Sequence, residues 1–221
     1  MLIREISLDT ETTGLSYING DKIIEIGCVE IIDKIITGKT FHSYLNTNKN
    51  ISLSAFNIHG INNQFLQGKP WFHDIAGHLI DFISNSKIII HNANFDLGFI
   101  NNELSHTSYS KICTSQVIDT LTLARKMYPG HSVSLDALCK KFSINLQARN
   151  KHGALIDAKL LALAYIEMTR AKQSHINFEY TGAQTSLNKI YKNHTFNRNV
   201  KLTKQENKLY TALLSKLDKK S

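Results

Sequence analysis

The sequence predicts a mixed α/β fold, with helices packed on the faces of one sheet and a basic tail after it. Three β-rich segments come first with no helical segment between them, which favours an antiparallel meander. Helical and extended patterns then alternate, which is typical of a sheet covered by helices. A length of 221 residues suits one domain with an appendage. We place the domain at residues 1–172 and the appendage at 173–221.

Two acids close the first predicted strand. The apolar run Leu2 to Leu8 ends in D-T-E at residues 9–11, and Lys22 to Ile32 and Gly38 to Leu45 predict the next two strands. Side chains two residues apart on a strand point to the same face, so Asp9 and Glu11 would lie side by side. Oxygen ligands of this kind favour Mg²⁺ or Mn²⁺. A strand end followed by a solvated turn is the competing interpretation.

The rest of the body alternates between helices and strands. In order, the expected elements are a helical turn at Leu53 to Phe56, a helix at Trp71 to Ser84, a strand at Lys87 to Ile90, a helix from about Asn94 to Leu104, a strand at Val117 and Ile118, a helix at Thr120 to Met127 capped by Asp119, a helix from Ser134 to Phe142, and a long helix from His152-Gly153 to about Lys172.

Two further acids fall at predicted helix starts. Asp96 begins the helix after the fourth strand, and Asp157 lies one turn into the long helix, five residues after His152. Each alone has a plain explanation, because carboxylates at helix N-termini are favoured by the dipole. Together with the two strand acids they suit a pair of divalent ions around one phosphate, and His152 could take a proton from the attacking water.

These motifs carry a family resemblance. D-T-E-T-T-G, H-N-A-N-F-D and H-x-x-x-x-D resemble the signature motifs of the DEDD superfamily of 3′-to-5′ exonucleases, in its histidine-bearing branch. K-I-I-E-I-G, L-A-R-K-M-Y-P-G, S-L-D-A-L-C and H-G-A-L-I-D make the chain most similar to the epsilon (proofreading) subunits of bacterial DNA polymerase III. The similarity spans about residues 4–170. It implies a ribonuclease-H-like exonuclease fold.

The resemblance also implies roles for individual residues. Asp9, Glu11 and Asp157 would bind two divalent cations, Mg²⁺ or Mn²⁺, with Asp96 as the fourth acid, acting directly or through water. His152 would be the general base. By the same resemblance, the residues expected to contact the terminal nucleotide of a DNA 3′ end are Asp9, Glu11, Asp157, His59 and Ser54. Ser54 stands where the family often has a glutamate.

The tail differs from the body in charge. Residues 171–221 hold 10 Lys and Arg against 3 Asp and Glu, whereas the rest of the chain holds 16 against 15. A capping box at Thr203 to Glu206 precedes an amphipathic helical stripe that ends near Leu217. By resemblance, this helix would engage the polymerase alpha subunit, and Gln184 with Leu187 would contact the sliding clamp. A polar linker and a helix folded onto the parent domain are the alternatives.

Composition excludes several protein classes. Three scattered cysteines argue against a disulfide framework and favour a reducing cytoplasm. We expect neither a signal peptide nor a membrane span. The sequence thus predicts a proofreading exonuclease within a DNA-directed DNA polymerase assembly. Two alternatives remain: a free-standing DEDD exonuclease that trims RNA or short oligonucleotides, and a catalytically silent scaffold of the same fold.

Overall fold

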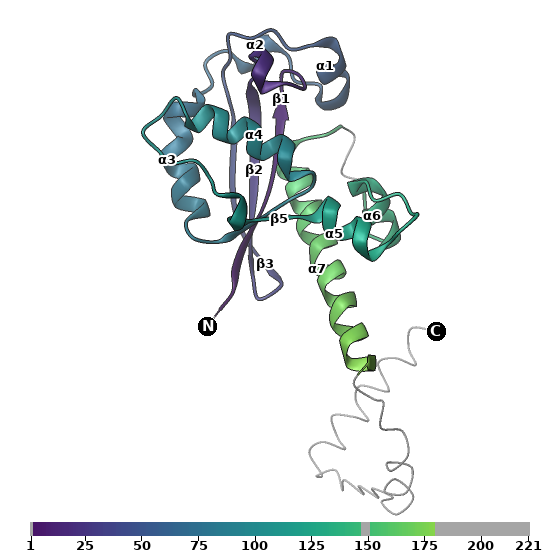
Figure 1. Cartoon of the computed structure of the whole chain (residues 1–221). Coiled ribbons are helices and arrows are strands. Elements are labelled where there is room, and N and C mark those ends of the chain that lie inside the picture. The colour runs from purple at the N-terminus through teal and green to yellow at the C-terminus, as the bar shows by residue number, and fades with distance from the viewer. Residues whose placement is uncertain (1, 147–150, 180–221) are drawn as a thin grey trace, which may run out of the picture. The chain divides into compact units, whose positions relative to one another are not determined.

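A five-stranded mixed sheet forms the centre of the protein (Figure 1). The computed structural model describes residues 2–146 and 151–179, with side chains as far as residue 170. The strand order is β3-β2-β1-β4-β5, in which β1, β2 and β3 are antiparallel and β4 and β5 run parallel to β1. The strands are β1 (Arg4–Thr12), β2 (Ile23–Ile32), β3 (Ile35–Tyr44), β4 (Lys87–Ile90) and β5 (Val117–Asp119). The predicted meander and mixed sheet are confirmed.

Helices connect and cover the strands. They are α1 (Leu53–His59), α2 (Asn63–Leu66), α3 (Phe72–Ile83), α4 (Ala93–Leu104), α5 (Thr120–Met127), α6 (Leu135–Lys141) and α7 (Ala154–Glu179), with 3₁₀ turns η1 (Tyr17–Asn19) and η2 (Thr114–Gln116). The predicted N-cap Asp119 is confirmed, because it accepts from the Leu121 N–H at 3.0 Å. Ser134, where a helix was expected to start, is the N-cap of α6 and accepts from the Ala137 N–H at 3.2 Å.

Several boundaries differ from the sequence prediction. The first strand agrees with the prediction: β1 ends at Thr12, and Glu11, opposite Glu25 of β2, lies in its last residues with Asp9. The third strand begins three residues early, at Ile35, directly after a tight turn in which Asp33 and Lys34 have positive φ. The helical turn at residues 53–56 continues as α1 to His59, and α2 was not predicted. Short polar segments such as these carry too little periodicity to fix an end.

The two faces of the sheet carry different helices. One core cluster packs Ile6 and Leu8 of β1 against residues of α3 and α4, and another packs Val29 and Ile31 of β2 against α7. Residues two apart on a strand share a face. Even-numbered residues of β1 therefore face α3 and α4, and its odd-numbered residues face α7.

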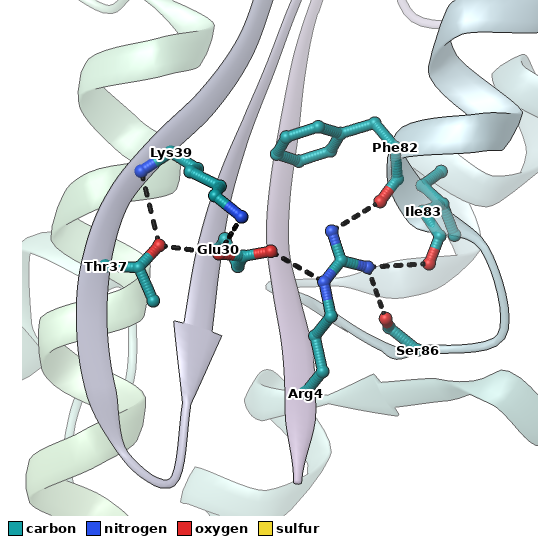
Figure 2. Close-up of polar contacts among 7 residues, drawn as sticks. All are labelled: Arg4, Glu30, Thr37, Lys39, Phe82, Ile83 and Ser86. Carbon is teal, nitrogen blue, oxygen red and sulfur yellow. Dashed lines mark hydrogen bonds and ion pairs between the residues drawn. The ribbon is translucent and has the colours of Figure 1, made fainter. Parts of the chain in front are cut away.

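A polar network ties β1 to the end of α3 (Figure 2). The Arg4 guanidinium donates to Glu30 at 2.6 Å, to the Ser86 hydroxyl at 2.6 Å and to the Phe82 carbonyl at 2.8 Å. It thereby satisfies a carbonyl that the helix end leaves without an intrahelical partner. This network lies at the start of β1, away from the acids at its other end.

Within the described ranges, no helix is both long and apolar enough to cross a membrane. The predicted amphipathic helix near Leu217 and the Gln184 and Leu187 motif lie outside the described residues.

Candidate active site

The acids of β1 point to the face that α7 covers. Asp9 and Glu11 are odd-numbered, and Glu11 is buried, with 9% of its surface exposed. Thr10 between them points to the opposite face, toward α4. Because side chains alternate along a strand, the two acids lie on one face of β1 and Thr10 lies on the other.

Thr10 holds the acid that comes from α4. The Asp96 Oδ1 atom accepts from the Thr10 backbone N–H at 3.0 Å and from the Thr10 hydroxyl at 2.7 Å. Burial raises the pKa of Asp96 to about 7, and the bonds from Thr10 oppose this rise only in part. Asp96 is thus held against β1 through Thr10, from the face opposite to the one that carries Asp9 and Glu11. Sequence reasoning did not single out Thr10, although its place between two acids was the available signal.

The start of α7 supplies the other two predicted residues. His152 Nδ1 lies 3.0 Å from Asp157 Oδ2. One possible ligand atom from each of Glu11, His152 and Asp157 lies within 4.8 Å of the others. Asp157 is buried, whereas 44% of the His152 side chain is exposed. The structure thus brings Glu11, His152 and Asp157 together. Asp9 lies two residues before Glu11 on β1, and Asp96 is hydrogen-bonded to Thr10 between them.

The donor set fits a hard divalent cation. Carboxylates this buried and this close are unfavourable unless charge of opposite sign is supplied. Carboxylate oxygens are the ligands that Mg²⁺ and Mn²⁺ prefer, and the imidazole of His152 lies next to them.

A pocket of about 250 Å³ adjoins the acids. It is lined by Glu11, Ser54 and His59, which were predicted to contact substrate, and by Leu15 and Phe95 among others. The lining is mostly apolar, which suits a planar base more than a phosphate. Leu15 was not predicted to line a pocket. It is an exposed apolar residue in the loop after the acids, and no motif in the sequence marks it.

His59 occupies the last turn of α1, before Gly60 with φ of 74°. Its Nδ1 atom accepts from the Ile61 N–H at 3.0 Å. Burial lowers the pKa of His59, and a hydrogen bond with the Thr12 backbone opposes that effect. Its imidazole is therefore held neutral and oriented at the pocket wall. Ser54 lies on the same helix, with its hydroxyl 3.1 Å from that of Ser52.

The sequence matches a known family over most of its length. The family described as exonuclease matches residues 6–165. The DNA polymerase III subunit epsilon of Rickettsia felis is 43% identical over 224 residues, which cover 97% of each chain. The epsilon subunit of Buchnera aphidicola subsp. Baizongia pistaciae is 48% identical over 197 residues, which cover 86% of this chain and 79% of that one.

Solved structures share the fold. Exonuclease X, in a complex with 5′ overhanging duplex DNA, is 29% identical with a TM-score of 0.58, over 76% of this chain and 92% of that one. The nuclease domain of 3′hExo, a DEDDh family member bound to rAMP, has a TM-score of 0.65 at 18% identity over the same shares. The second likeness concerns the fold alone.

Proposed function

This chain belongs to the exonuclease family, among the DNA polymerase III epsilon subunits, and we propose that it removes mismatched nucleotides from the primer 3′ end during DNA replication. It is a 3′-to-5′ exonuclease that releases nucleoside 5′-monophosphates. The observation that carries this function is the convergence of Glu11, His152 and Asp157 beside a mostly apolar pocket. A frayed 3′ end can place its last base in such a pocket, whereas a paired end must first be opened.

Each residue has a part in the proposed mechanism. Asp9, Glu11 and Asp157 would hold two divalent cations, Mg²⁺ or Mn²⁺, with Asp96 as the fourth acid, acting directly or through water. When bound, such cations neutralise charge on the phosphate and lower the pKa of water. His152 donates through Nδ1 to Asp157, so Nε2 is the nitrogen that takes the proton from water. The remaining contacts, from His59 and Ser54 in the pocket wall, hold the terminal nucleotide.

The function is tested by single-turnover digestion in Mg²⁺. The substrates are a DNA primer-template with a paired 3′ end, the same primer with a mismatched end, and a single-stranded RNA. Faster release of monophosphates from the mismatched DNA end supports proofreading. A preference for RNA would favour the free-standing trimming enzyme, and no digestion of any substrate would leave only the silent scaffold.

Asp96 gives a pH-dependent prediction. Its pKa of about 7 lies above the usual 3.8, so the stability this group contributes is fully present below pH 3.8 and is lost as pH rises toward 7. A cation requires the ionised form. We therefore expect the rise in Tm that Mg²⁺ produces over EDTA to be small at pH 6 and larger at pH 8. The Asp96→Asn variant should show a smaller rise with little pH dependence; an equal pH dependence in both proteins would exclude this assignment.

The tail supplies the proposed partners. Residues 173–221 would dock on the polymerase alpha subunit, and Gln184 with Leu187 would contact the sliding clamp, in the cytoplasm where the DNA is copied. The match to the Rickettsia felis epsilon subunit supports this, because it covers 97% of the chain and so includes the tail. A chain that ends at residue 174 should digest DNA normally and fail to co-purify with the alpha subunit. Retained binding would place the contact in the nuclease domain.

A further inference from the structure

Two residues of β2, Glu25 and Gly27, lie against the start of α7. Together with His42 of β3, which is hydrogen-bonded to Glu25, we call them the helix seat. Gly27 is opposite Asp9 on one side and His42 on the other, and Glu25 is opposite Glu11. Residues directly opposite on paired strands share a face. The helix seat therefore continues the face of the β1 acids across the sheet and under α7.

Gly27 allows the helix to approach the strand backbone to backbone. A Cβ atom at this position would lie 2.4 Å from both Cα and N of Leu155. Carbon atoms in contact are normally about 3.5 to 4.0 Å apart, so any larger residue must displace the helix by about an ångström. Glycine within a strand often marks such an approach. Because Leu155 lies between His152 and Asp157, this contact sets the position of both.

Glu25 lies against the turn that joins His152 to the helix. Its carboxylate oxygens are 3.8 and 3.9 Å from the place where a Cβ of Gly153 would be. The Glu25 carboxylate is hydrogen-bonded to His42 Nε2 at 2.7 Å. Burial raises the pKa of Tyr44, and the charge of Glu25 and a hydrogen bond to it raise that pKa further. The Glu25 side chain is thus fixed from the β3 side.

A carboxylate is an unfavourable choice at this position unless it has a role. Glu25 is only 2% exposed and lies opposite Glu11, and like charges opposite each other on paired strands are destabilising. Further along the same face of β2, Val29 and Ile31 pack against α7 as apolar residues. The pattern changes from apolar to Glu and Gly only where the strand passes under the active site.

We propose that Glu25 and Gly27 are positioning residues, which fix the first turn of α7 so that His152 and Asp157 meet the acids of β1. This inference rests on the proposed function, because it takes His152 and Asp157 as working residues. Neither positioning residue needs to touch the substrate.

A second contact between α7 and the sheet, further along the helix from the active site, offers a matched control. Glu5 on the same face of β1 is also a buried carboxylate held against α7, where it accepts from Tyr165 at 2.6 Å and from Lys34 at 2.6 Å. It lies six residues before Glu11, about 20 Å along the strand. Loss of Glu5 removes a buried polar anchor of α7 without touching the helix seat.

The test compares Glu25→Ala, Gly27→Val and Glu5→Ala in the full chain. A misplacement of about 1 Å can reduce a rate about 10²-fold. We expect Glu25→Ala and Gly27→Val to lower kcat by about this factor with KM within about threefold, and at least to halve the rise in Tm produced by Mg²⁺. Glu5→Ala should lower Tm without the cation but keep kcat and the Mg²⁺ response.

The outcomes distinguish a failure of the positioning role from a failure of the proposed function. If Glu25→Ala and Gly27→Val lose only Tm, as Glu5→Ala does, the positioning role is wrong. If Glu25→Ala does not fold, the isosteric Glu25→Gln takes its place, and a wild-type Mg²⁺ response in that variant would likewise overturn the inference. If the wild type digests no substrate, the proposed function fails, while the Mg²⁺-induced rise in Tm still tests the helix seat.

Discussion

Replacement of Asp9 by alanine is expected to lower the single-turnover rate on mismatched DNA by about 10³-fold or more. Asp9 lies on the β1 face that α7 covers, two residues from Glu11, and we assign it to the cations. Cations at a transferring phosphate stabilise the transition state by several kcal/mol, and a loss of about 4 kcal/mol corresponds to about a thousandfold. The measurement is product release in Mg²⁺ under single-turnover conditions.

A matched control removes an aspartate that lies elsewhere. Asp81 is exposed on α3, so Asp81→Ala should digest DNA at the wild-type rate. The Asp9→Ala protein should also lose much of the Mg²⁺-induced rise in Tm. A rate within tenfold of wild type in Asp9→Ala would remove this residue from the metal site.

Replacement of His152 by alanine should have the second largest effect. A positioned base contributes about 10²- to 10⁴-fold, so the barrier should rise by roughly 3 to 5 kcal/mol while metal-dependent activity persists. The side chain is 44% exposed and makes its bond to Asp157 through one nitrogen, so the fold should tolerate its loss. The residual rate should increase with pH, since hydroxide can replace the missing base.

The control for this variant is His78→Ala, on the exposed surface of α3. It should match the wild type in rate and in pH profile. Equal rates for His152→Ala and the wild type would contradict the assignment of His152 as the base.

Much of the fold could be predicted from local patterns. The period of two placed Asp9 and Glu11 on one face, and the caps Asp119 and Ser134 marked helix starts that the structure confirms. Such features depend on residues a few positions apart, which is why sequence spacing reveals them. The early start of β3 could not be predicted, because it depends on strand pairing and turn geometry. The end of α1 at His59 did have a local signal in Gly60, whose positive φ ends the helix.

The residues that make up the site could likewise be predicted from the sequence. The sequence by itself determined that four acids and a histidine stand at strand and helix ends, and the ordered motifs identified the exonuclease family. It could not show that Glu11, His152 and Asp157 converge within 4.8 Å, nor that Thr10 holds Asp96, 86 residues away.

Only the tertiary structure decided how these residues are held. The bare backbone of Gly27 under Leu155 and the buried Glu25 beside Gly153 become visible only when β2 and α7 are packed together. The raised pKa of Asp96 also arises from burial, which packing creates. Distances between distant segments depend on the whole core rather than on neighbouring residues, so the sequence determined which groups the site contains and the packing determined where they meet.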